Sequence, residues 1–132
     1  MTTRSVAART CVLIVLALTL LACGGQGAVT RSDLQITVQS DPPTPQVGGG
    51  VLAVTVTGQD GEPVNDATLA VEGNMTHPGM VPVIAHIDGG EDGVYRVPFT
   101  WSMGGDWVIS VTARAPDGRQ AQADFPFTVE GD

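Results

Sequence analysis

The chain has 132 residues, enough for one small domain, with two cysteines, no lysine and a net charge of −8. This acidic balance argues against nucleic acid as a partner, because affinity for phosphate comes mainly from lysine and arginine. Two cysteines are too few for the disulfide framework that stabilises many small secreted domains, so a hydrophobic core must hold the fold.

Residues 1–22 have the pattern of a lipoprotein signal peptide that forms a helix. Arg4 and Arg9 precede an apolar run, residues 11–22, which is short for a membrane span. The run ends in Leu-Leu-Ala-Cys, which resembles the bacterial lipobox with Cys23 as the lipidated residue. The alternative is an ordinary signal peptide with an incidental cysteine. The lipobox predicts an exported protein, lipid-anchored through Cys23 at the extracytoplasmic face of a bacterial membrane.

Residues 23–33 are predicted to be a flexible tether, because they are small and polar. With residues 1–22 removed, the chain keeps all 14 acidic residues and four arginines, a net charge of −10. With Cys11 removed and Cys23 acylated, no free thiol remains for a disulfide, a metal or catalysis.

Residues 34–130 are predicted to form one domain of short strands. Apolar and polar residues alternate with the period of a half-buried strand, and glycine, proline and aspartate separate the runs. No helical period follows the signal. We expect an all-β fold, an immunoglobulin-like antiparallel β-sandwich of about seven strands. The expected strands are residues 34–39, 51–57, 66–72, 81–87, 94–100, 107–113 and 120–129.

Two features of this pattern are specific enough to test. Residues 41–50, with three prolines and three glycines, are expected to be irregular. Residues 93–113 are expected to form the central hairpin of the core, with a glycine-rich turn at residues 102–106.

Three of the four methionines and both histidines are concentrated between residues 73 and 107. Met75, His77 and Met80 fall within six residues of an expected loop, Met103 lies in a second loop, and His86 lies on the strand between them. Thioether sulfur is a soft ligand for Cu(I), and imidazole binds copper and zinc alike. The set therefore favours copper over zinc, with His86 the weaker candidate. The alternative is that the methionines fill gaps in the core and that His86 is an ordinary strand residue.

Arrangements typical of enzymes are absent from the sequence. It has no Gly-x-Ser-x-Gly motif, no phosphate-binding glycine loop and no lysine, and neither histidine has a serine in a motif context. The paired acids Glu91 and Asp92 fall in an expected turn. We therefore expect a protein that is not an enzyme.

At this point the chain resembles the YtkA-like family of small exported β-sandwich domains, which are similar to FixH-type proteins. The matching segments are Asp60–Ala67, the loop residues Met75, His77 and Met80, then Gly93–Tyr95, Phe99 and Met103–Trp107. The resemblance covers about Val51 to Ala113. It implies an extracytoplasmic, non-catalytic domain involved in copper handling or in the assembly of respiratory complexes. The chain has one histidine in the loop where relatives have more.

Two hypotheses about function follow from these observations. The first is a membrane-anchored module that binds or delivers Cu(I), or assists assembly of a respiratory complex, with a protein of the envelope or that complex as partner. The alternative is an immunoglobulin-like interaction or structural domain of the cell envelope that binds no metal.

Overall fold

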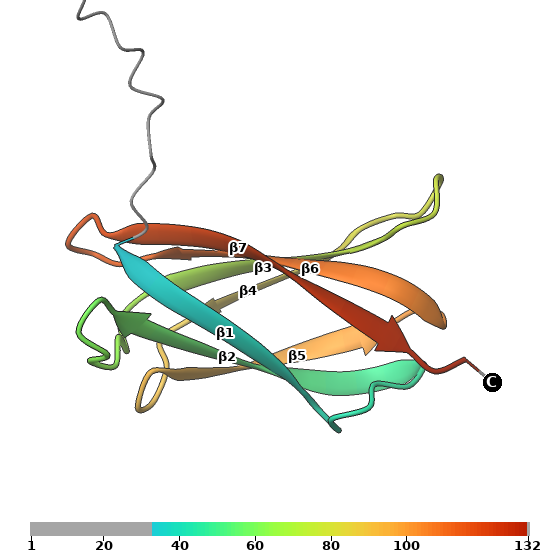
Figure 1. The fold of residues 1–132 in the computed structure, drawn as a ribbon, viewed down its shortest axis with the longest axis horizontal. Helices are drawn as coiled ribbons and strands as arrows, with labels where there is room; N and C mark the ends of the chain where they lie inside the picture. Colours follow the sequence, from blue (N-terminus) through green and yellow to red (C-terminus); the bar gives the residue numbers. More distant parts are fainter. Residues whose placement is uncertain (1–32, 132) are drawn as a thin grey trace, which may run out of the picture. The chain divides into compact units, whose positions relative to one another are not determined.

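Seven antiparallel strands form in residues 33–131, the part of the chain that the computed structural model describes (Figure 1). The predicted signal helix and Cys23 lie outside this part. Within it, no helix long and apolar enough to cross a membrane occurs. The strands are β1 (Leu34–Asp41), β2 (Gly48–Gly58), β3 (Thr68–Met75), β4 (Val83–Asp88), β5 (Val94–Trp101), β6 (Gly105–Arg114) and β7 (Gln120–Val129).

The strands pack as two sheets, which confirms the predicted all-β, antiparallel sandwich. One sheet has the order β1-β2-β5 and the other the order β4-β3-β6-β7. Alternate residues of each strand face the space between the sheets, where the buried apolar side chains form a single cluster. This cluster includes the predicted inward residues Tyr95, Val97, Trp107, Ile109 and Val111.

The predicted hairpin of residues 93–113 is wrong. β5 pairs with β2 in the three-stranded sheet, whereas β6 pairs with β3 and β7 in the other sheet. Residues 102–104 therefore cross from one sheet to the other. Alternation shows which side chains face the core, but it is the same for either pairing partner, so it cannot distinguish a hairpin from a crossing.

The prediction of an irregular segment at residues 41–50 is wrong at both ends, because Asp41 is the last residue of β1 and residues 48–50 belong to β2. Gly48, Gly49 and Gly50 begin β2 and lie opposite Trp101, Thr100 and Phe99 of β5. A Cβ atom at Gly50 would stand 3.4 Å from Nε1 of Trp101. The indole of Trp101 therefore lies directly against this part of the strand, a contact that a composition-based assignment to loop overlooks.

The two ends of the sandwich carry different loops. The first end, called here the methionine end, carries the loops 42–47, 76–82 and 102–104, which lie toward the C-terminal side of Figure 1. The second, called here the entry end, is where β1 begins, and it carries the loops 59–67, 89–93 and 115–119.

At the entry end, buried polar contacts join loops that are distant in sequence. The hydroxyl of Tyr95 donates a hydrogen bond to the carbonyl of Val64 at 2.7 Å and accepts one from the amide of Ala67 at 3.0 Å. Burial raises the pKa of the Tyr95 hydroxyl. The side chain of Asn65 accepts a hydrogen bond of 2.6 Å from the amide of Gly93. These contacts fix the 59–67 loop against β5.

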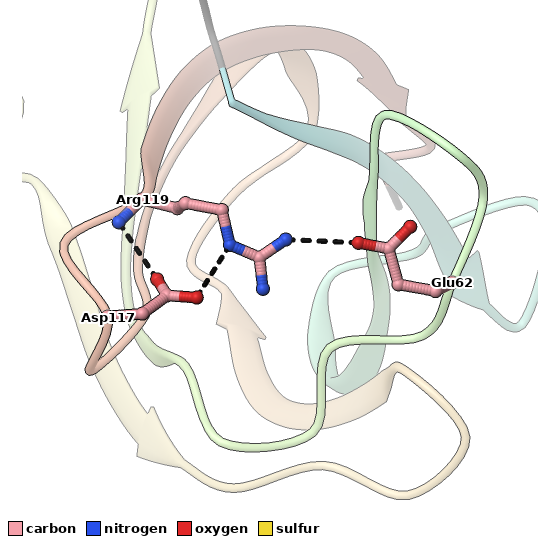
Figure 2. Close-up of polar contacts among 3 residues, drawn as sticks. All are labelled: Glu62, Asp117 and Arg119. Atoms are coloured by element: carbon pink, nitrogen blue, oxygen red, sulfur yellow. Dashed lines mark hydrogen bonds and ion pairs between the residues drawn. The ribbon is translucent and has the colours of Figure 1, made fainter.

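Arg119 adds a surface contact at the same end (Figure 2). Its guanidinium donates to Asp117 at 2.7 Å and to Glu62 at 3.0 Å, so it joins the β6–β7 turn to the β2–β3 loop. The pKa of Glu62 is lowered by a hydrogen bond with its own backbone and by Arg119. The pKa of Asp117 is lowered by the backbone amide of Arg119 and then by its side chain. The contact therefore links a turn of the four-stranded sheet to the loop that connects the two sheets, through charge-assisted hydrogen bonds.

Candidate functional site

Met75 lies in a strand and not, as predicted, in a loop. It is the last residue of β3, it pairs in register with Trp107 of β6, and it is only 9% exposed. Its Cε atom packs near Gly105, where a Cβ would stand 3.1 Å away. The strand extends three residues beyond the predicted boundary because Gly73 removes the side chain that would otherwise collide with the ring of Phe99. Met75 thus fills the end of the core.

His77 and Met80 lie in the loop 76–82, which projects beyond the neighbouring strand ends in Figure 1. The imidazole of His77 is exposed, and Met80 is half-buried and packs against the core cluster. Gly79 turns the chain between them with φ at +91°, a conformation that other residues rarely adopt. The loop therefore presents one exposed nitrogen ligand and one partly covered sulfur.

Met103 lies in the crossing of residues 102–104 and is 44% exposed. Its carbonyl accepts a hydrogen bond of 3.0 Å from the indole nitrogen of Trp107. The backbone of this loop is therefore held to the core while the thioether of Met103 remains open to solvent. The alternative that the methionines fill gaps in the core therefore does not describe Met103.

The loops that carry His77, Met80 and Met103 lie at the same end of the sandwich. The amide of Thr76 donates a hydrogen bond of 3.3 Å to the carbonyl of Asp106, which joins the end of β3 to the start of β6. The register of Met75 with Trp107 places the two loops on adjacent strands. Four of the five predicted ligands therefore share the methionine end, with three thioethers and one imidazole among them.

His86 does not belong to this group. It lies within β4 opposite Ala70, and its side chain is exposed on the outer face of the sheet, whereas Ala85 and Ile87 on either side face inward. In residues 33–131 no group of three or more histidine, cysteine, aspartate or glutamate side chains is placed to hold a metal ion. A metal at the methionine end would have to be held mainly by sulfur.

Aromatic rings form the floor under these loops. Phe99 lies 4.8 Å from Trp101, and Trp101 lies 5.5 Å from Trp107, both in edge-to-face geometry. Phe127 joins the group at 5.7 Å from Trp101. The alternation of residues 120–129 is a signal for the inward orientation of Phe127, but nothing in the sequence connects this ring with the methionine loops. The rings give the loops a rigid support.

Comparison with known proteins gives a family. The family model described as YtkA-like matches residues 29–112. No curated protein matches.

Two solved structures are similar in fold. The soluble domain of PmoD from Methylocystis sp. ATCC 49242 (Rockwell) is 18% identical, with a TM-score of 0.45, over 74% of this chain and 90% of that one. An engineered protein from the Northeast Structural Genomics Consortium is 19% identical, with a TM-score of 0.39, over 73% of this chain and 20% of that one.

Proposed function

The chain belongs to the YtkA-like family, and from this premise we propose that it is a non-catalytic copper-handling module of a bacterial envelope. In this proposal Cys23 carries a lipid anchor, the sandwich stands on the extracytoplasmic side, and Cu(I) is the cargo. A protein of a respiratory complex or of the envelope receives the metal.

The observation that supports this proposal is that the candidate ligands lie at one end of the sandwich. His77 and Met103 are exposed, Met80 is half-buried, and the hydrogen bond from Thr76 to Asp106 joins the loop of His77 and Met80 to the strand that follows Met103. Thioethers prefer Cu(I) to zinc, which has little affinity for them. Residues 33–131 contain no cysteine, so no thiolate within the sandwich competes for the metal.

The exposure of these residues suits transfer rather than storage. A site built from side chains at the tips of loops leaves the metal open to an incoming ligand from a partner. Met75, buried directly behind, would fix the floor of the site and would add a sulfur only if the loop moved. We therefore assign His77, Met80 and Met103 as the primary ligands and Met75 as a supporting residue.

The test is competition for Cu(I) against a chromophoric chelator without oxygen. The full chain is used in detergent, with Cys11→Ser and Cys23→Ser so that no thiol binds copper. Replacing Met80 and Met103 by leucine, which keeps volume and apolarity, should weaken Cu(I) binding by about tenfold or more, since soft ligands are lost.

The two histidines provide a matched control. His77→Gln should weaken Cu(I) binding, whereas His86→Gln should leave it unchanged because His86 lies on the outer face of β4. Equal affinities for the parent and the double leucine variant would contradict the proposal. Zinc binding as tight as copper binding would also contradict it.

A further inference from the structure

The exposed apolar side chains of the sandwich are concentrated at one end. In residues 33–131, four large hydrophobic residues are exposed: Val47 at 42%, Val81 at 82%, Ile84 at 62% and Met103 at 44%. Val47, Val81 and Met103 lie in the three loops of the methionine end, and Ile84 is the second residue of β4 at that end. Over the same residues the entry end has none. This set is called here the apolar tip.

Carboxylates accompany the apolar tip. Glu72 lies opposite Ile84 in the register of β3 and β4. The carbonyl of Glu130 accepts a hydrogen bond from the amide of Val47 at 3.3 Å. Asp106 lies at the start of β6, one residue before Trp107. Each loop that carries an exposed apolar side chain therefore has an acidic residue in, or next to, the contacts that hold the loop.

These three carboxylates are not neutralised by ion pairs within the described residues. Their side chains accept hydrogen bonds from neutral groups: Asn74 bonds to Glu72, Thr128 to Asp106 and Gln46 to Glu130. Arginine ion pairs in residues 33–131 involve Asp41, Glu62 and Asp117 instead. The loops of the methionine end contain no arginine or lysine. The apolar tip thus has uncompensated negative charge around it.

We propose that the apolar tip binds a segment of another protein in which apolar side chains are flanked by lysine or arginine. Exposed apolar side chains clustered at one end favour a partner that removes them from water, and the surrounding charge selects its sign. A second copy of this chain would bring the same carboxylates together, and an anionic membrane surface would be repelled, so both are disfavoured occupants. This inference does not require that copper is bound.

The first experiment uses a defined probe. The probe is a nonapeptide in which five alternating leucine and alanine residues are flanked by two lysines at each end. A counterpart peptide has glutamates in place of the four lysines. Methyl signals of Val47, Val81, Ile84 and Met103 are followed by NMR in the full, metal-free chain with Cys11→Ser and Cys23→Ser. The lysine peptide should shift these signals, with binding about tenfold weaker at high salt, because charge attraction is screened.

Variants test the source of that salt dependence. The triple change Glu72→Gln, Asp106→Asn and Glu130→Gln should remove it. The matched triple change at the entry end, Asp60→Asn, Asp66→Asn and Glu91→Gln, should leave it unchanged. Equal binding of both peptides, shifts centred on the entry end, or no shift with either peptide would overturn the proposal. The Glu72, Asp106 and Glu130 variant should retain its Cu(I) affinity, so failure of this proposal and failure of the copper proposal are distinguishable.

A second experiment uses the absence of lysine. A carbodiimide joins carboxylates to amines without a spacer, and this chain has no amine apart from its N-terminus. Cross-linking in an intact envelope should therefore produce adducts with other proteins, mapped by mass spectrometry to Glu72, Asp106 or Glu130. Adducts confined to Asp60, Asp66 or Glu91 would overturn the assignment of the apolar tip.

Discussion

The two ends of this sandwich differ in how their loops are held. At the entry end, Tyr95, Asn65 and Arg119 make hydrogen bonds to loops that are far away in sequence. At the methionine end, the loops are held mainly through their backbones, by bonds such as Thr76 to Asp106 and Val47 to Glu130 and by the indole of Trp107, while methionine, valine and histidine side chains face solvent. The two ends therefore differ in the use of side chains: at the entry end they fasten the loops, and at the methionine end several remain available for ligands and partners.

The largest expected effect tests the aromatic floor. Trp107 is 1% exposed and contacts Trp101 and Phe99. Trp107→Ala should lower the free energy of unfolding by about 3–5 kcal/mol because it opens a large cavity. Thermal and urea unfolding measure the change. Trp107→Phe, which keeps a ring, serves as the control and should lose less. A melting temperature unchanged in the alanine variant would show that the floor does not support the fold.

The next effect tests the polar contacts of the entry end. Tyr95→Phe keeps the ring but leaves the amide of Ala67 and the carbonyl of Val64 without their partner. Buried groups left unpaired destabilise a protein by about 1–3 kcal/mol, so we expect a loss in that range by urea unfolding. Unfolding at the parental urea concentration would indicate that water replaces the hydroxyl and that the entry end is not fixed as described.

A smaller effect, confined to a pH range, is expected for Arg119. The pKa values of Glu62 and Asp117 are lowered in the folded state. Their contribution to the free energy of unfolding is therefore present above the unfolded pKa values of 4.5 and 3.8, and it is lost as pH falls through the folded pKa values. Arg119→Gln should therefore lower the melting temperature slightly at pH 7 and not at all in strong acid. A difference between parent and variant that grows on acidification would contradict this sign.

The smallest effect is expected for the exposed methionine. Met103→Ser should change the free energy of unfolding by less than about 0.5 kcal/mol, because the side chain lies on the surface and its backbone bond to Trp107 is kept. Differential scanning calorimetry is sufficient to measure it. A loss comparable to that of Tyr95→Phe would show that Met103 braces the core, and the contrast between the two ends would then fail.

The sequence predicted which residues face the core but not how the strands pair. The alternation around Tyr95 and Trp107 was sufficient to place both side chains inside. It could not show that β5 and β6 lie in different sheets, because pairing depends on contacts that are distant in sequence.

The kinds of side chain in the candidate site could be predicted from the sequence, but their arrangement in space could be predicted only in part. The ligand chemistry of Met80, His77 and Met103 can be read from the residues themselves, whereas their shared end follows from the observed course of the strands. Met75 was assigned to a loop because the predicted strand ended at residue 72, whereas the strand continues through Gly73, which admits the ring of Phe99. The partners of Tyr95 lie 28 and 31 residues away and have no local signal.

The direction in which the chain enters the sandwich has a consequence for reach. Leu34 begins β1 at the entry end, and the strand runs toward the methionine end over eight residues, roughly 26 Å. Under the proposed anchoring through Cys23, the attachment would therefore act on the end of the sandwich opposite to His77 and Met103. These two side chains would then be free to meet the exposed domain of a neighbouring protein.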